Sequence, residues 1–164
     1  MKQITTIDYS HRKLCEIGAK WIKNTGNHYF RCPYVLIEFC PIGGESPDIF
    51  GLRANHSILI EVKVSKNDFK TDLKKIYRKE GFGIGLTRYY LCPTDLIKIE
   101  ELPDKWGLLY CNEKGKITII KYSECFEDRN FNQELIIMQS VIRRLAGKNQ
   151  VLDFRNKQLN ESKD

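Results

Sequence analysis

The sequence contains no apolar run of the roughly 20 residues that are needed to span a bilayer. Its N-terminal stretch, MKQITTIDYSHRK, lacks the continuous apolar character of a secretory signal peptide. The six cysteines include no CxxC pair, and their spacing does not match that of zinc ribbons or zinc fingers. We therefore expect a cytoplasmic protein that does not bind membranes and whose thiols are free.

Two further patterns are missing. Gly81, Gly83 and Gly85 follow an expected helix and precede an expected strand, which is the reverse of the order in a dinucleotide-binding fingerprint. The three histidines share no spacing that indicates a catalytic or metal site. Nucleotide-cofactor chemistry and histidine-based chemistry are therefore both disfavoured.

The chain has the size and composition of one folded domain. It has 164 residues, of which 41% are hydrophobic and 29% are charged, and its formal net charge is +6. This length is sufficient for a sizeable core, and the positive charge is compatible with a polyanionic partner. We expect a single domain over residues 1–155, followed by a polar tail over residues 156–164.

Hydrophobic periodicity predicts an alternation of helices and strands. Helices are expected at 10–24, 65–80 and 132–146, and strands at 34–40, 48–52, 57–64, 88–93, 108–111 and 116–122. The last helix carries an apolar seam formed by Leu135, Met138, Ile142 and Leu145. This order predicts an α/β fold in which helices flank a mixed central sheet, without internal repeats.

The third expected strand carries an acid and a base on one face. Glu61 and Lys63 are two residues apart, and residues i and i+2 of a strand share a face. A hairpin turn at residues 54–55 would place Asp48 directly opposite Glu61, where two carboxylates repel unless a cation lies between them. A turn one residue later would place Asp48 opposite Lys63, which makes an ordinary ion pair. The sequence leaves both registers open.

A row of basic residues follows this strand. Ser65 begins a capping box, so a helix is expected to start at once. Lys66, Lys70, Lys74 and Arg78 are spaced four apart and would line one face of that helix. Such a row is typical of a solvated helix face, but beside a metal site it would also suit contacts with backbone phosphates.

Pro47-Asp48 followed by Glu61-Val62-Lys63 resembles the signature of the PD-(D/E)XK nuclease superfamily. The expected order of elements over residues 10–93 is similar to the αβββαβ core of the restriction-endonuclease-like fold, to which a C-terminal hairpin and helix are added. The stretch EVKVSKNDFKTDLKKIYR, which begins at Glu61, resembles a segment of MmcB-like members that are associated with DNA repair.

The resemblance implies phosphodiester hydrolysis that depends on Mg²⁺ (or Mn²⁺). Asp48, Glu61 and the Val62 carbonyl would bind the metal, and Lys63 would position or deprotonate the attacking water. Relatives often carry a further glutamate on the first helix, but Glu16 is expected to face solvent. The additional acid would then be Glu38 or Glu45.

The implied partner is nucleic acid, with DNA favoured over RNA, in repair, recombination or a mobile-element setting. Relatives often dimerise, so a homodimer is compatible with the resemblance. Two alternatives stay open, which are a non-catalytic nucleic-acid-binding module and an interaction protein on the same fold.

Overall fold

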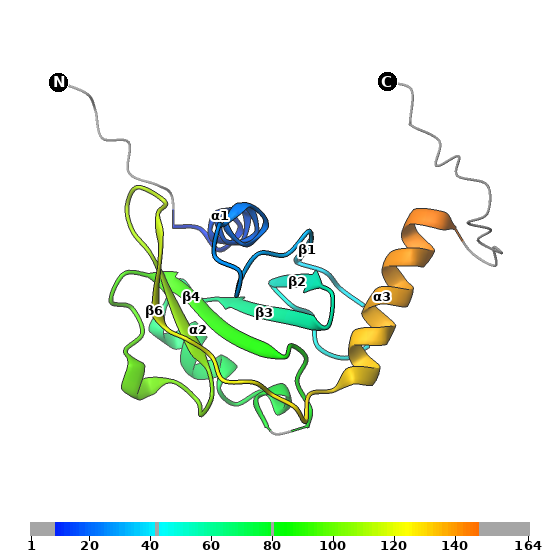
Figure 1. Ribbon diagram of the computed structural model, residues 1–164. Helices are drawn as coiled ribbons and strands as arrows, with labels where there is room; N and C mark the ends of the chain where they lie inside the picture. The colour runs from blue at the N-terminus through cyan, green and yellow to red at the C-terminus, as the bar shows by residue number, and fades with distance from the viewer. Residues whose placement is uncertain (1–8, 42, 80, 148–164) are drawn as a thin grey trace.

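The computed structural model describes residues 9–41, 43–79 and 81–147, so the expected polar tail at 156–164 lies outside the described residues (Figure 1). Its α-helices are α1 (His11–Asn24), α2 (Lys66–Asp72) and α3 (Phe131–Ala146), and it has 3-10 turns η1 (Ile76–Arg78) and η2 (Ile99–Glu101). Its strands are β1 (Tyr34–Ile37), β2 (Ile49–Arg53), β3 (His56–Val62), β4 (Thr87–Pro93), β5 (Gly107–Cys111) and β6 (Ile117–Lys121). Within the described ranges, no helix has both the length and the apolar character that a membrane span requires.

The fold is a mixed α/β arrangement with a six-stranded sheet in the order β1-β2-β3-β4-β5-β6. The pairs β1–β2, β2–β3 and β5–β6 are antiparallel, whereas β3–β4 and β4–β5 are parallel. The parallel step from β3 to β4 is made through α2, as expected for a strand–helix–strand crossover. The C-terminal hairpin extends the central sheet, because β5 pairs with β4.

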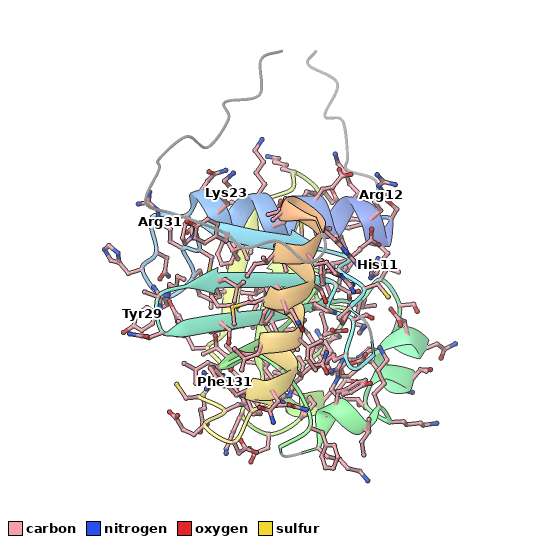
Figure 2. The ribbon with its side chains drawn as sticks, turned by 90° about the vertical axis from the view of Figure 1, so that its right-hand side faces the viewer. His11, Arg12, Lys23, Tyr29, Arg31 and Phe131 are labelled. Atoms are coloured by element: carbon pink, nitrogen blue, oxygen red, sulfur yellow. The ribbon has the colours of Figure 1, made fainter. Side chains whose placement is uncertain are left out.

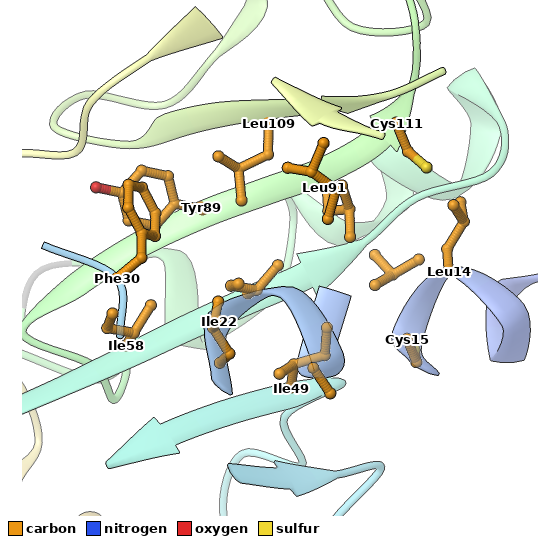
Figure 3. Close-up of a cluster of buried hydrophobic side chains, with 14 of the residues drawn as sticks. Leu14, Cys15, Ile22, Phe30, Ile49, Ile58, Tyr89, Leu91, Leu109 and Cys111 are labelled. Atoms are coloured by element: carbon orange, nitrogen blue, oxygen red, sulfur yellow. The ribbon is translucent and has the colours of Figure 1, made fainter. Parts of the chain in front are cut away.

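Each face of the sheet is covered by its own hydrophobic cluster. Successive strand residues point to opposite faces, so Ile58, Ile60 and Val62 lie in the cluster under α1, whereas Leu59 lies in the cluster with Phe69 of α2. Figure 3 shows the first cluster, in which Leu14 and Ile22 of α1 meet Ile49, Ile58 and Leu91 of the strands. Because both faces are buried, the odd-numbered side chains of β3 are enclosed as well.

Helix α1 begins where the sequence predicts. The Ser10 side chain caps it by accepting a hydrogen bond from the Lys13 backbone N–H. Gly18 allows a close approach to the sheet, since a Cβ at this position would lie 2.6 Å from Ile49 Cδ1. Glu16 is exposed and pairs with basic neighbours, which confirms that it faces solvent.

The β2–β3 hairpin adopts the first of the two registers that the sequence allows. Arg53 pairs with His56 across the turn, and Ile49 pairs with Ile60. Asn55 has a φ of +57°, a conformation that asparagine tolerates in tight turns. Extending this register by one residue places Asp48 opposite Glu61.

Two expected elements are shorter than predicted. The strand expected at 34–40 ends at Ile37, because Glu38 has a φ of +45° and leaves the extended conformation. The helix expected at 65–80 ends at Asp72, and the separate 3-10 turn η1 follows after Lys75, which is extended. The prediction of one continuous helix from 65 to 80 is therefore wrong.

The apolar seam of α3 faces away from the body of the protein. Helix α3 instead packs through Gln133, Glu134, Ile137 and Ser140, which are its buried residues. Glu134 accepts hydrogen bonds from the Ser57 hydroxyl and from the Gly85 backbone N–H. These buried polar contacts decide which side of the helix meets the sheet, and the seam is left exposed.

Candidate functional site

Asp48 directly precedes β2 and lies next to the end of β3. Its Oδ2 accepts a hydrogen bond from the Val62 backbone N–H at 2.8 Å. Its Oδ1 lies 3.3 Å from Nε2 of His11 on α1. The Asp48 side chain is 18% exposed, so it remains accessible to solvent while its orientation is set by two neighbouring elements.

Glu61 lies near the C-terminal end of β3, Lys63 directly follows this strand, and both are buried. Lys63 Nζ is 3.3 Å from Glu61 Oε2 and 3.9 Å from Asp48 Oδ2. The ammonium group therefore contacts both carboxylates, although the register places Asp48 opposite Glu61 and not opposite Lys63. Lys63 therefore supplies part of the positive charge that is needed to hold the Asp48 and Glu61 carboxylates close together.

A buried arginine completes the inner side of this site. Arg78, on η1, contacts Asp72 Oδ2 through Nε at 2.6 Å and Glu61 Oε2 through Nη2 at 3.1 Å. Asp72 also accepts a hydrogen bond from the Tyr90 hydroxyl and lies 3.4 Å from Lys63 Nζ. The break after α2 is what allows Arg78 to turn inward toward these carboxylates.

Glu45 supports this arginine from the loop before β2. One of its carboxylate oxygens contacts Arg78, and the other accepts a hydrogen bond from the Ile84 backbone N–H at 3.0 Å. Glu45 is buried, and both of its oxygens have partners. As an additional metal-binding acid it is therefore less suitable than Glu38, which is half exposed and reaches His11.

The acids outnumber the bases around this site. In the network of lysine and arginine ion pairs, four carboxylates (Glu45, Asp48, Glu61 and Asp72) face three cationic groups (Lys63, Lys75 and Arg78), which leaves one excess negative charge within this network if all are ionised, since 4 − 3 = 1. Arg88 acts on Glu45 by its charge alone. Burial, aided by the charges of Asp48 and Asp72, raises the pKa of Glu61 to about 7 against the opposing effect of Arg78 and Lys63. A proton on Glu61 relieves the excess charge, and a bound cation could do the same.

The residues present fit a hard divalent cation. Among the described residues, Glu61 Oε1 has no hydrogen-bond partner although it is buried. Asp48 supplies a second carboxylate that is open to solvent. Oxygen donors of this kind are the ligands that Mg²⁺ prefers. The contribution of the Val62 carbonyl stays a prediction.

Two of the other buried charges, Lys63 and Asp72, keep their ionised forms near neutral pH. Burial alone would lower the pKa of Lys63, but Glu61, Asp72 and Asp48 outweigh it and raise that pKa. Burial would raise the pKa of Asp72, but hydrogen bonding and charge from Arg78 hold it well below its usual range. Lys63 is therefore a cation and a hydrogen-bond donor, which suits it to holding a water or stabilising an anion.

Ligand atoms of three residues gather at the mouth of the site, where α1 begins. His11, Cys15 and Glu38 each offer one atom, and these atoms lie within 4.8 Å of one another. Burial, together with the charges of Asp48 and Glu38, raises the pKa of Cys15 to about 12, so its thiol is protonated at neutral pH. Figure 2 shows His11 at one end of α1, and it is His11 that links this group to Asp48.

The basic row does not form one exposed face. Lys70 and Lys74 are exposed, and Lys66 pairs with Glu101. The Arg78 side chain is only 4% exposed. The prediction that Arg78 belongs to a surface that contacts phosphates is wrong, because the chain leaves the helix before this residue and buries its guanidinium. Phosphate contacts by the three lysines stay a prediction.

Sequence reasoning missed three members of this site. Asp72 lies within the segment that carries the MmcB-like resemblance, but no role followed from its spacing. The spacing of Arg78 predicts an exposed helix position, whereas its side chain on η1 is buried. His11 lies against Asp48, but the spacing of histidines along the chain does not reveal which strand a helix residue meets.

Comparison with known proteins bears on the fold alone. No family model matches the chain, and no curated protein matches it. A solved structure described as "SPO1766 protein of unknown function from Silicibacter pomeroyi" is similar to this chain with a TM-score of 0.60. It shares 20% sequence identity, and the match covers 90% of this chain and 100% of that one. The overall architecture is thus shared with a bacterial protein whose function is unknown.

Proposed function

We propose that the chain is a metal-dependent nuclease that hydrolyses phosphodiester bonds in DNA on a restriction-endonuclease-like core of the PD-(D/E)XK type. The observation that carries this proposal is the meeting of Asp48, Glu61 and Lys63 at the end of β3, in the register that sets the two carboxylates opposite each other. The order α1-β1-β2-β3-α2-β4 supports it, since it agrees with the αβββαβ core that the resemblance implies.

Each residue has a role that its environment supports. Asp48 and Glu61 would hold Mg²⁺ (or Mn²⁺), with Glu38 or His11 as a further neighbour at the mouth. When bound, the metal supplies a polarised phosphate and a water of lowered pKa. Lys63 would hold that water by a hydrogen bond and stabilise negative charge as it develops on the phosphate. Arg78 keeps Glu61 in place from the inner side.

The surroundings are compatible with a polyanionic substrate. The chain carries a net charge of +6. Lys70 and Lys74 project into solvent from the segment that directly follows β3, so they lie near the strand end that carries the site. They could contact phosphates on either side of the cleaved bond, with an affinity that falls as salt is added. A setting in DNA repair, recombination or a mobile element is part of this proposal.

The test is cleavage of a labelled panel of single-stranded, duplex, flap, junction and RNA substrates with Mg²⁺, Mn²⁺ or EDTA. Asp48→Asn keeps an oxygen that can accept the Val62 N–H while it removes the charge, and Lys63→Met keeps the apolar stem. Each variant should lower metal-dependent cleavage by about 100-fold or more, the scale of losing one charge-stabilising group. Asp104→Asn, at an exposed loop position, is the matched control and should cleave normally.

Metal binding supplies a readout that does not depend on turnover. Mn²⁺ binding, followed by electron paramagnetic resonance, should weaken in Asp48→Asn and in Glu61→Gln but not in Asp104→Asn. Cleavage that persists in Asp48→Asn protein, or that is unaffected by EDTA, would show that this site does not perform the reaction.

One observation favours a non-catalytic nucleic-acid-binding module as the second candidate. Arg78 and Lys63 both contact Glu61 Oε2, so the chain's own cations satisfy one of the two oxygens of a proposed ligand. For such a module we expect DNA binding that is equal in EDTA and Mg²⁺, with no Mn²⁺ signal and no cleavage of any substrate in the panel.

A further inference from the structure

Helix α3 exposes large apolar side chains in a continuous row. Phe131, Leu135, Ile142 and Leu145 are 52%, 47%, 52% and 84% exposed, and Met138 lies between them on the same side of the helix. Ile136, beside this row, is 38% exposed. We call Phe131, Leu135, Met138, Ile142 and Leu145 the α3 seam.

The spacing of the α3 seam is that of a helix-pairing surface. Its members follow one another at intervals of four, three, four and three residues, which is the heptad pattern of a and d positions. A helix that only has to cover a sheet needs a broader apolar face and no such regular alternation. The pattern therefore indicates that the seam receives the side chains of a second helix.

The described part of the chain leaves this seam exposed. The α3 residues that pack on the body are Gln133, Glu134, Ile137 and Ser140, which lie on another side of the helix. In Figure 2, α3 lies in front of the strands as the outermost element, with Phe131 at its lower end. No described segment of the chain crosses in front of it in that view.

We propose that the α3 seam binds the α3 seam of a second copy of this chain, as an antiparallel helix pair that forms a homodimer. This inference does not depend on the proposed nuclease activity. A two-fold interface must be self-complementary, and the positions that flank the seam permit this. Asn132, Gln139 and Ala146 are uncharged, and Glu134 is buried and bonded within its own chain. At these described positions, no like charges therefore meet beside the seam when it faces itself.

The distribution of charge along the helix selects the antiparallel orientation. Arg143 and Arg144 lie in the last turn of α3, and Glu134 is the acid of its first turn. Arg144 is held on the body side, where it donates to the Cys40 carbonyl at 2.6 Å. An antiparallel pair keeps these basic ends apart and aligns the two helix dipoles favourably, whereas a parallel pair does neither.

The exposed area agrees with a dimer of moderate affinity. The seam and Ile136 leave on the order of 500 Å² of apolar surface in water per copy, given that a large apolar side chain buries about 150–200 Å². Two copies would together bury about 1,000 Å², which is the lower limit for a specific interface. We therefore expect a dissociation constant in the micromolar range.

Sedimentation velocity over a series of protein concentrations tests the proposal. The wild-type chain should shift from the monomer mass of 19.2 kDa toward twice that mass as concentration rises through the micromolar range. Ile142→Asp and, separately, Leu145→Asp should weaken association by at least about 100-fold, because each dimer would bury two unpaired carboxylates against the apolar seam of the other copy.

The matched control is Ile99→Asp, which makes the same change at a residue on η2 that is 44% exposed. This variant should associate as the wild type does. Circular dichroism and thermal unfolding should show that both seam variants are folded, since each changes an exposed side chain. A wild-type chain that stays monomeric at several hundred micromolar, a dimer that tolerates both seam variants, or equal loss in Ile99→Asp would overturn the proposal.

Discussion

Replacing Glu61 by glutamine should stabilise the protein at alkaline pH, although it removes a proposed metal ligand. Glu61 is buried at the end of β3, and Asp48 and Asp72 are close enough to disfavour its charge. Glutamine has nearly the same shape and no charge. Its amide oxygen can face Lys63 and Arg78 as Oε2 does, while its amide nitrogen takes the place of Oε1.

The size of this effect follows from the pKa of Glu61. Burial is the largest cause that raises this pKa from 4.5 to about 7. A carboxyl group whose folded pKa is raised stabilises the protein fully below its unfolded pKa, and this stability is lost as the pH rises through the folded pKa. The ionisation of Glu61 should therefore lower the free energy of unfolding of the wild type by about 3 kcal/mol between about pH 4.5 and pH 7. Glutamine cannot ionise and avoids this loss.

Urea denaturation in EDTA, at a series of pH values from 4.5 to 8.5, measures the difference in the free energy of unfolding. The difference between Glu61→Gln and wild type should be close to zero at pH 4.5. It should favour the variant by about 3 kcal/mol at pH 8.5. Glu127→Gln, at an exposed position, controls for the loss of one surface charge and should give a flat, small difference.

One result would refute the reasoning. If Glu61→Gln is less stable than wild type by the same amount at pH 4.5 and pH 8.5, the ion pairs with Lys63 and Arg78 outweigh the cost of burial. The site would then be a closed salt-bridge network that needs no cation. Adding Mg²⁺ distinguishes a metal site from a closed salt-bridge network. At a metal site, Mg²⁺ should stabilise the wild type at pH 8.5 and leave Glu61→Gln unchanged.

Three other changes test the packing around this site and the fold that holds it. Arg78→Met should lower the free energy of unfolding by about 3–5 kcal/mol at pH 7 in urea titrations, because it leaves buried carboxylates without their cation; Arg78→Lys should recover part of the loss. Gly107→Ala should cost about 1–3 kcal/mol, since its Cβ would lie 2.7 Å from the Ser123 backbone N, whereas Gly26→Ala meets nothing within 4 Å and should be nearly neutral in thermal melts. Burial, with a smaller contribution from nearby arginines, lowers the pKa of His56 to about 4. The free energy of unfolding of the wild type should therefore decrease as the pH drops from about 6.5 to 4, because His56 is protonated more readily in the unfolded chain. His56→Gln should remove that part of the pH dependence.

The hairpin shows how far local pattern could predict the candidate site. Alternation along β3 predicted that Glu61 and Lys63 share a face, and turn propensity predicted both of the allowed registers. In the register that forms, Asn55 takes a left-handed conformation in the turn, which local pattern does not select over the alternative. The contact of Lys63 with Asp48 could not be predicted from either register, because it depends on how a long side chain bends inside a buried space.

The segment from α2 to η1 and helix α3 show where local pattern failed. The spacing of Lys66, Lys70, Lys74 and Arg78 suits a continuous helix, but buried carboxylates on β3 and α2 offer Arg78 partners that solvent does not. The α3 seam was predicted as an apolar row, but its exposure was not. Polar contacts of Glu134 with Ser57 and Gly85 oriented the helix instead.

The sequence by itself determined the order of the elements, the mixed α/β class and the chemical types at the end of β3, because periodicity, capping and turn residues act over a few neighbouring positions. Only the tertiary structure decided that Asp72 and Arg78 join Glu61, that His11 meets Asp48, and that α3 presents its seam to solvent. Those outcomes depend on contacts between residues far apart in the chain, where the cost of leaving a charge or polar group unpaired in the interior exceeds local preference.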